Sequence, residues 1–321
     1  MKRLMPLILP LLIAVTACQN HPPVKQQSFG KINSLLVVVN NEDWKGPLGD
    51  TIRRYFARDY EVLPQREPLF SISQIPNDIF DKNFFLLRNI LVIKYGQKPG
   101  ITYIRDKYAK PQLIVVIEGR NKDEIMQLIR DNADAIIKAF QKNETELIGS
   151  RKFKSLVSDS LIRQELHISI KIPDYYKLIV HKDGFFWYRH DLKFGSKNIL
   201  LYKVPLKDTD SLAAEVVKIR DSIGKLYIPG PMPGSYMRTE KAFSPVQHKV
   251  RINGREALES RGLWEMENDY MAGPYVNYII PLPEHNMAVV LEGFVYLPSE
   301  NKRNLMTELQ AILQTARPVE E

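Results

Sequence analysis

Cysteine is almost absent from this chain, because Cys18 is the only one among 321 residues. With no second cysteine, the mature chain can contain no internal disulfide and no zinc site built on cysteine pairs, and no further thiol is available as a nucleophile. The hydrophobic content of 44% and the charged content of 26% are ordinary for a globular protein. The chain is therefore long enough and apolar enough to form a hydrophobic core without covalent cross-links.

Recognisable catalytic motifs are also missing. The sequence contains no Gly-x-Ser-x-Gly elbow, no His-Glu-x-x-His motif, no Walker loop and no dinucleotide fingerprint. His181 and His190 fall on a predicted hairpin with a tight turn at Asp183 and Gly184, but they lack a third fixed ligand for a metal ion. The sequence therefore predicts no metal site and no cofactor, and it does not indicate any particular reaction.

Long hydrophobic runs are missing except near the N-terminus, where Lys2 and Arg3 precede an apolar run over residues 4–15. This run is shorter than the roughly 20 residues that cross a bilayer, and it fits a secretory signal peptide. The Val-Thr-Ala-Cys that follows resembles the bacterial lipobox, whose cysteine is acylated and becomes the first mature residue. We therefore expect a lipoprotein signal peptide over residues 1–17 and a membrane anchor on Cys18. The alternative is a chance cysteine after an ordinary signal peptide.

The mature chain has a small excess of positive charge. Loss of Lys2 and Arg3 with the signal lowers the formal net charge from +8 to +6. This charge favours anionic surfaces such as lipid head groups, although it also fits ordinary solvated surface charge. Nucleic acid is not expected as a partner of an exported protein. Residues 18–29 are polar and contain two prolines, which predicts a short flexible tether.

The remaining chain predicts an α+β fold. Residues 34–39 form a continuous β-branched run typical of a buried strand, and residues 121–141 carry an apolar stripe at helical spacing. Residues 143–150 are polar and predict a linker. Further elements are predicted as strands over residues 112–119, 198–203 and 287–293, and as helices over residues 47–60, 211–223 and 299–315.

Segments of the two halves resemble each other. Residues 89–94 resemble residues 198–203, and residues 114–119 resemble residues 287–293. Both members of the second pair end in Glu-Gly and are followed by a predicted helix. We therefore expect two related α/β-sandwich-like units with mostly antiparallel sheets, over residues 30–148 and 149–321, the second carrying an insertion near residues 205–270. Convergence on common strand and helix patterns would also explain the similarity.

Five short segments carry a family resemblance: residues 40–44, 227–231, 234–237, 261–265 and 273–275. Through them the chain resembles a family of Bacteroidetes lipoproteins described as domain of unknown function 4837. The resemblance implies a location in the cell envelope and implies no activity. In that lineage, acidic residues just after the lipidated cysteine accompany export to the cell surface. Their absence here implies an outer-membrane lipoprotein that faces the periplasm.

A loop rich in proline and glycine is the candidate binding surface. Pro229, Gly230 and Pro231 make a strand unfavourable at this point, so the segment is predicted to be a shaped surface loop. Tyr236, Arg238 and Trp264 are expected to line a cleft with it and to offer aromatic and cation-π contacts to a sugar or a peptide. The alternative is that the aromatic residues pack inside the fold.

The predicted function is a non-enzymatic binding or assembly module for an envelope protein or a glycan. The alternative is an envelope hydrolase with an unrecognised acid pair, for which Glu265 and Glu267 are the first candidates. With Asp269 these residues recur at every second position and would share one face of a strand.

The lipid anchor predicts a clear effect of Cys18→Ala. In the native host, we expect the wild-type protein to fractionate with membranes and to have a mass that begins at Cys18 plus acyl chains. The variant should lose both properties because it has no thiol to acylate. Intact mass spectrometry and membrane fractionation measure them, and an unacylated wild-type product would contradict the prediction.

Overall fold

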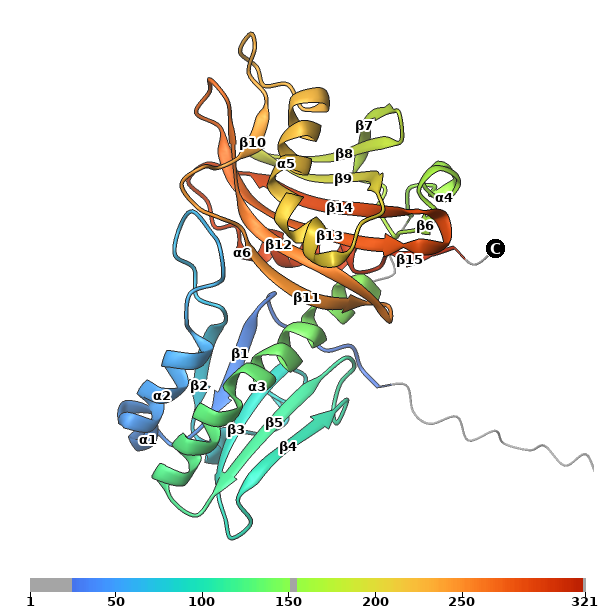
Figure 1. Cartoon of the computed structure of the whole chain (residues 1–321). Helices are drawn as coiled ribbons and strands as arrows, with labels where there is room; N and C mark the ends of the chain where they lie inside the picture. The colour runs from blue at the N-terminus through green and yellow to red at the C-terminus, as the bar shows by residue number, and fades with distance from the viewer. Residues whose placement is uncertain (1–24, 151–154, 320–321) are drawn as a thin grey trace, which may run out of the picture.

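The computed structural model describes residues 25–150 and 155–319, which form two α+β units joined end to end (Figure 1). The predicted signal peptide, Cys18 and the first part of the tether lie outside the described residues. In the ranges that are described, no helix combines the length and apolar character needed to span a bilayer. Antiparallel pairings predominate among the strands of the described residues, so the predicted α+β class with mostly antiparallel sheets is confirmed.

The first unit is a mixed sheet with the strand order β2-β1-β3-β5-β4. Three of its pairings are parallel, and only β4 runs antiparallel to its neighbour. The inner strands are β-branched runs because both of their faces are covered. The strands are β1 (Ser34–Val38), β2 (Ser71–Ile75), β3 (Asn89–Tyr95), β4 (Gly100–Arg105) and β5 (Leu113–Gly119).

Helices cover one face of this first sheet. They are α1 (Asn41–Lys45), α2 (Pro47–Phe56) and α3 (Lys122–Ser150), and their apolar residues pack against the strands. The opposite face is covered by the segment around η1 (Asn77–Ile79), from which Phe80 and Phe84 pack on the sheet.

The second unit is built on an antiparallel sheet with the order β10-β12-β13-β14-β9-β8-β7. A further strand, β11, pairs with β12 beside β10. The predicted hairpin is confirmed, because Asp183 and Gly184 connect β7 to β8 with positive φ angles of 53° and 75°. The strands are β7 (Lys177–Lys182), β8 (Phe185–Leu192), β9 (Gly195–Pro205), β10 (Met237–Thr239), β11 (Val246–Ile252), β12 (Arg255–Met266), β13 (Ala272–Leu282) and β14 (Met287–Tyr296).

Two helices enclose this second sheet. Helix α5 (Thr209–Tyr227) covers one face, and its N-terminus is capped by Asp208, which accepts a hydrogen bond from the Ser211 N–H at 2.9 Å. Helix α6 (Arg303–Leu313) covers the other face. Smaller elements complete the unit: α4 (Ser160–Leu166), η2 (Pro283–His285) and a two-stranded sheet of β6 (Ile168–Ser169) and β15 (Arg317–Pro318).

The two units do not share a topology. In the first unit, β3 and β5 pair in parallel, whereas the segments expected to correspond to them, in β9 and β14, pair antiparallel. A duplicated unit would keep the relative direction of its paired strands. The sequence similarity therefore reflects common strand and helix patterns. The region expected as an insertion supplies α5 and the whole of β10, β11 and β12. The three strands belong to the second sheet, and α5 covers one of its faces.

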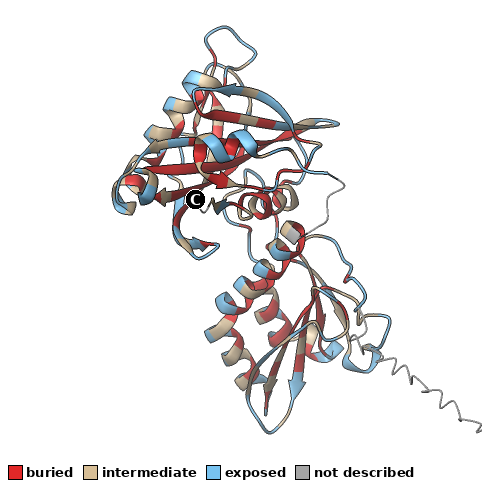
Figure 2. Ribbon diagram, turned by 90° about the vertical axis from the view of Figure 1, so that its right-hand side faces the viewer, coloured by how far each residue is buried: buried red, intermediate tan, exposed pale blue. Residues whose placement is uncertain are grey.

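One apolar core runs through both units. Buried residues of the first sheet, α3, α6 and one face of the second sheet form a single continuous cluster. Figure 2 shows these buried residues inside each unit and at the end of α3 where the units meet. Phe140 of α3 and Leu309 of α6 belong to this cluster and are fully buried. The two units are therefore held together by apolar packing.

The predicted linker over residues 143–150 is wrong, because this segment is the last part of α3. Two of its polar residues, Asn143 and Glu144, are buried and paired. Glu144 accepts hydrogen bonds from Arg88 Nη1 at 2.6 Å and from Asn89 Nδ2 at 2.7 Å, and Asn143 donates to Asn89 at 2.8 Å. Burial raises the pKa of Glu144 despite the positive charge of Arg88. The polar residues that suggested a linker instead fix α3 to the first sheet.

The Arg88–Glu144 pair predicts a large loss of stability on Glu144→Ala. The single variant leaves a buried guanidinium without its counter-ion, which costs about 3–5 kcal/mol. We expect Arg88→Met combined with Glu144→Leu to be much less destabilising, because no buried charge remains. Urea unfolding followed by circular dichroism measures both. Glu146→Ala is the matched control on the exposed side of the same helix, and equal effects at positions 144 and 146 would contradict the prediction.

Candidate functional site: a cleft between the two units

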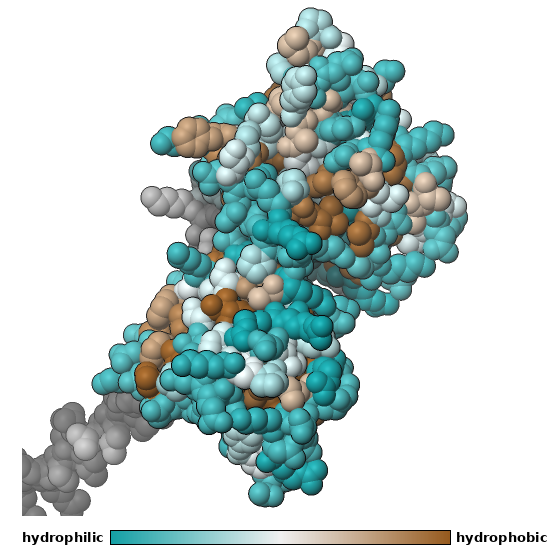
Figure 3. Space-filling view, turned by 90° about the vertical axis from the view of Figure 1, so that its left-hand side faces the viewer, coloured by the Kyte–Doolittle hydropathy of each residue, from teal (hydrophilic) through white to brown (hydrophobic). Residues whose placement is uncertain are grey.

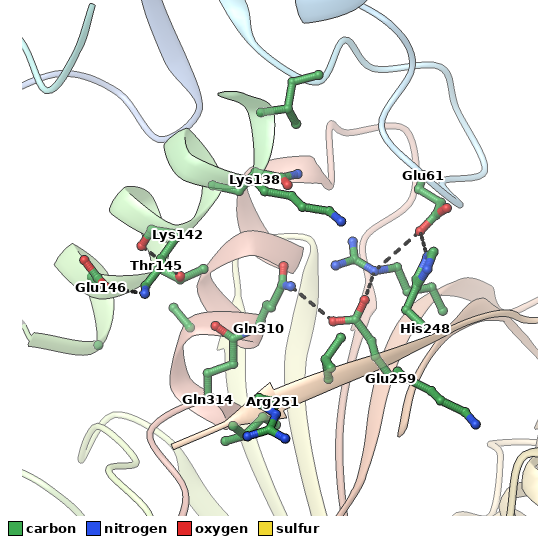
Figure 4. A pocket seen from close by; sticks show the side chains of 18 of the residues that line it. Glu61, Lys138, Lys142, Thr145, Glu146, His248, Arg251, Glu259, Gln310 and Gln314 are labelled. Atoms are coloured by element: carbon green, nitrogen blue, oxygen red, sulfur yellow. Dashed lines mark hydrogen bonds and ion pairs between the residues drawn. The ribbon is translucent and has the colours of Figure 1, made fainter. Parts of the chain in front are cut away.

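A cleft of about 1850 Å³ lies where the two units meet. One wall comes from the first unit, through residues 58–62 and the second half of α3. The other wall and the floor come from the second unit, through β11, β12 and α6 (Figure 4). On the face shown in Figure 3, the surface where the units meet is mostly hydrophilic. The cleft is larger than the roughly 300–1,000 Å³ of a typical small-molecule pocket and has room for an extended ligand.

Glu259 and Arg261 form the floor of the cleft. They are two residues apart on β12, so both side chains lie on the face of the sheet that α6 covers. Arg261 Nε donates to Glu259 Oε1 at 2.8 Å. The other carboxylate oxygen accepts from Tyr278 Oη at 2.6 Å and from Gln310 Nε2 at 3.4 Å. The floor is therefore a network of charged and polar side chains held in fixed positions.

The ionisation of this floor follows from its contacts. Burial alone raises the pKa of Glu259, but the charge of Arg261 and the hydrogen bonds from Arg261 and Tyr278 bring it below its ordinary value. The neighbouring carboxylate and phenols raise the pKa of Arg261 despite its burial. Burial raises the pKa of Tyr278 well above its ordinary value. The pair is therefore an ionised carboxylate beside a guanidinium at neutral pH.

Polar contacts tie the floor to the first unit. Arg261 Nη1 donates to Tyr60 Oη at 3.2 Å, and its Nε lies 3.8 Å from Glu61 Oε2. His248 Nε2 lies 2.9 Å from the same Glu61 oxygen (Figure 4). These contacts fix the segment after α2 against β11 and β12. The shape of the cleft thus depends on both units.

The cleft carries more positive than negative charge. Eight Lys and Arg residues line it, against five Asp and Glu residues. Each of these acids has a cationic partner, whereas Lys138 makes no ion pair with any residue of the described ranges and points into the cleft (Figure 4). Lys142, one turn further along α3, lies 3.7 Å from Glu146. Two of the eight cations, Lys249 and Arg251, pair with acids outside the lining, so the net positive charge of the cleft is smaller than this count. The cations that have no ion-pair partner in the described ranges favour an acidic ligand.

Aromatic faces are scarce in the cleft. Among its lining residues, Tyr60 is the one phenol, and it is 8% exposed. Proteins that bind sugars commonly offer open aromatic faces for stacking, and this wall offers none of that kind. The lining instead includes amide and hydroxyl side chains, among them Gln141, Thr145 and Gln314. Such a surface suits the polar main chain of a peptide better than a glycan.

The residues predicted as a binding surface lie elsewhere, because none of the six lines the cleft. Pro229 and Tyr236 pair across the base of the proline-glycine loop, and Gly230 N–H donates to Ser235 O at 3.0 Å. Pro231 lies on the exposed part of the same loop. The loop projects from the end of the second unit opposite the first (Figure 1).

Trp264 does not contribute to that surface. Its side chain is 1% exposed, packs in the core beneath α5 and donates a hydrogen bond from Nε1 to Val295 O at 3.2 Å. A large apolar ring on the covered face of a central strand is stabilised by burial, which explains the difference from the prediction. Of the expected aromatic surface, only Tyr236 remains partly exposed, near Lys225.

Arg238 forms ion pairs with both carboxylates of the proposed acid pair, Glu265 and Glu267. It lies opposite Glu265 in the register of β10 and β12, and its Nη2 is 2.8 Å from Glu265 Oε1. Its Nη1 forms an ion pair with Glu267. Two carboxylates bound to one guanidinium do not provide the separate acid and base that a hydrolase needs. The geometry does not support the hydrolase alternative.

Metal binding gains no support from the predicted hairpin. His181 Nε2 lies 2.7 Å from Glu165 Oε1, and the ring of His190 packs against Tyr175 and Tyr176. Across residues 25–150 and 155–319, no group of three or more His, Cys, Asp or Glu side chains is placed to hold a metal ion.

The sequence analysis did not identify the residues of the cleft, because their patterns in the sequence are not specific to a binding site. Glu259 and Arg261 alternate on β12, but the same pattern occurs on many solvated strands. Lys138, Lys142 and Thr145 form a polar stripe along α3, which would mark any exposed helix face. Their convergence depends on contacts between distant parts of the chain, as between Tyr60 and Arg261.

Together, a mixed sheet with helices on one face and an antiparallel sheet enclosed by two helices define a two-unit α+β protein with a polar cleft between its units. The chain belongs to the family described as domain of unknown function (DUF4837), whose model matches residues 155–315. A second model, also a domain of unknown function (DUF8532), matches residues 28–152.

Further comparisons give distant similarities. No curated protein matches the chain. The Saccharomyces cerevisiae Ran-binding protein Mog1p is 13% identical, with a TM-score of 0.32, over 48% of this chain and 91% of that chain. LpqN of Mycobacterium tuberculosis, described as involved in cell envelope biogenesis, is 15% identical, with a TM-score of 0.28, over 46% of this chain and 81% of that chain.

The lowered pKa of Glu259 predicts a pH-dependent effect of Glu259→Gln. The charged pair contributes stability above the ordinary glutamate pKa of 4.5, and that stability is lost as the pH falls through the lower folded value. We expect the variant to be about 2 kcal/mol less stable at neutral pH. The difference from wild type should shrink in acid.

Urea unfolding at a series of pH values measures this difference. Glu256→Gln is the matched control, because Glu256 lies on the same strand with its side chain 79% exposed. A constant difference across the pH range would show that Glu259 does not act through its charge.

Proposed function

We propose that this protein is a lipid-anchored component of a bacterial cell envelope that binds a partner protein and catalyses no reaction. The proposed anchor is Cys18, and the proposed location is the periplasmic face of the outer membrane. The lipobox-like sequence before Cys18 and the lack of acidic residues over residues 19–27 support this location.

The position of the N-terminal segment fits an anchor close to the first unit. Ser28 N–H donates to Lys110 O at 3.2 Å, and Phe29 forms a bridge with Leu87. Only a few residues therefore separate Cys18 from the folded body. At about 3.5 Å per extended residue, the stretch from position 18 to position 25 reaches about 25 Å. The proposed anchor holds the first unit near the membrane surface.

The cleft is the observation that carries the binding proposal. Its volume of about 1850 Å³, its excess of cations and its fixed floor suit an extended acidic ligand. A protein segment fits better than a glycan, because open aromatic faces are scarce on the cleft walls. The main chain of a peptide offers N–H and C=O groups that the amide and hydroxyl side chains of the lining can bind.

Site-specific crosslinking in living cells tests this function. We expect a photo-crosslinking amino acid in place of Lys138 to form a covalent adduct with one particular protein, identified by mass spectrometry. The same amino acid in place of Asp131 should form none, because Asp131 lies about two turns earlier on α3 and outside the cleft. Both positions are exposed on the helix, so the comparison isolates the cleft.

A cleft-filling variant completes the test. We expect Thr145→Trp to remove the adduct, because a large ring at this position occupies the space between α3 and the floor, whereas Asp131→Trp should leave it unchanged. Adducts formed equally from positions 138 and 131, or adducts with glycan alone, would contradict the proposed function.

A further inference from the structure

β11 presents one edge without a neighbouring strand. It pairs with β12 along its whole length, from Val246 opposite Arg261 to Ile252 opposite Arg255, and no described residue pairs with its other edge. The register has no shift, and the strand contains no proline. Natural sheets protect such an edge with a bulge, a proline, a covering segment or charged side chains, lysine above all. Of these devices, β11 has the charged side chains alone, on Lys249 and Arg251. This edge is long, regular and open.

The turn after β11 determines which main-chain groups are free. Asn253 and Gly254 connect the two strands with φ angles of 47° and 87°, as in a two-residue hairpin turn. Ile252 and Arg255 therefore form the hydrogen-bonded pair that closes the hairpin. Because such pairs alternate along an antiparallel ladder, the main-chain groups of Gln247, Lys249 and Arg251 point away from β12.

This free edge lies in the cleft. Residues 247–252 of β11 all line the cleft, and residues 246–249 are exposed. The strand runs along the side of the second unit that faces the first (Figure 1). Across the cleft, α3 presents Lys138 and Lys142. The cleft therefore combines an open hydrogen-bonding edge with a basic opposite wall.

The charges select one class of occupant. Lys249 pairs with Asp210 at 3.0 Å and Arg251 with Glu256 at 3.2 Å, and all four side chains are exposed. A second copy of β11 would bring the two cations against the same cations of its own, which disfavours pairing of the protein with itself. The N-terminal segment over residues 19–27 contains no acid. An acidic strand, in contrast, would place alternate side chains toward Lys138 and Lys142 and the others beside Lys249 and Arg251.

We propose that the cleft binds an extended acidic segment of its partner protein as an additional strand on the free edge of β11. This inference rests on the proposed function and specifies how the partner is held. Main-chain hydrogen bonds supply the register, and alternate acidic side chains supply the specificity.

Peptide binding to the full-length chain tests the proposal. Peptides are selected from a random phage-displayed library, synthesised, and titrated by fluorescence anisotropy. We expect the selected sequences to be acidic, rich in β-branched residues and free of proline. We expect N-methylation to weaken binding at every second peptide position, because methylation blocks the main-chain groups that face β11. If charge alone held the peptide, the effect of N-methylation on affinity would not alternate from one peptide position to the next.

A matched pair of variants isolates the main chain. Lys249→Pro and Lys249→Ala remove the same charge, but only proline also removes the N–H that points into the cleft. Proline is tolerated at an edge where that N–H faces solvent. We expect Lys249→Pro to bind about tenfold more weakly than Lys249→Ala. Matching circular dichroism spectra and unfolding midpoints establish that both variants are folded.

The outcomes separate this inference from the proposed function. Suppose that the selected peptides no longer bind the Thr145→Trp variant but bind the Lys249→Pro and Lys249→Ala variants equally. This result would overturn strand addition and leave the cleft as the binding site. A dimer that dissociates with Lys249→Pro would assign the edge to a second copy and overturn the acidic partner. The crosslinking experiment at position 138 tests the proposed function independently of all these peptides.

Discussion

The packing of α3 against two different partners is the constraint on which the rest of the structure depends. Its apolar stripe covers the first sheet, and its last turns pack against α6 of the second unit. The buried pair of Arg88 and Glu144 fixes the rotation of the helix, because one rotation alone brings both carboxylate oxygens to their donors. The exposed face of α3 is consequently fixed as well, and it forms the wall of the cleft.

The second unit contributes the other half of this arrangement. Helix α6 lies between the second sheet and α3, and Gln310 and Gln314 on its polar side reach the floor of the cleft. The buried pair of Glu259 and Arg261 connects β12 to Tyr60 across the interface. Breaking the Arg88–Glu144 pair or the Glu259–Arg261 pair would disturb the interface between the units as well as a local contact, because both pairs lie near this interface.

A second buried pair stabilises the opposite face of the same sheet. Arg220 of α5 binds both oxygens of Glu292 on β14 at 2.7 Å, and its guanidinium lies 3.5 Å from the ring centre of Tyr275. This pair fixes α5 as Arg88 and Glu144 fix α3. The sheet therefore has α5 held in position on one face, and α6 covers the other. β11 lies at the edge of the sheet, where Gln247 and Lys249 contact the first turns of α5.

The sequence predicted elements where local chemistry determines them. The apolar stripe from Ile125 to Phe140 predicted the helix, and the Asp183-Gly184 turn predicted its hairpin. Prediction failed where a partner is remote in sequence. Asn143 and Glu144 suggest a linker by themselves, and their partners Arg88 and Asn89 lie more than fifty positions earlier. Trp264 could equally be a surface ring or a core ring until β10, β12 and α5 are assembled around it.

The candidate site was inaccessible from the sequence for the same reason. Its floor joins β12 to the segment after α2 and to α6, so three separate regions must fold before Glu259, Tyr60 and Gln310 become neighbours. The free edge of β11 is a property of the sheet order, which no pattern within residues 246–252 reveals. Periodicity identifies a strand, but it does not identify which strand remains unpaired.

The continuous core has a kinetic consequence for anything that enters the cleft. Two units joined by a flexible linker could close on a ligand, and a slow conformational step would then limit association. In the described residues the two units share one apolar core, so widening the entrance would expose apolar side chains to water. Capture then depends on diffusion and on long-range electrostatic attraction, and the bound lifetime depends on the contacts made inside.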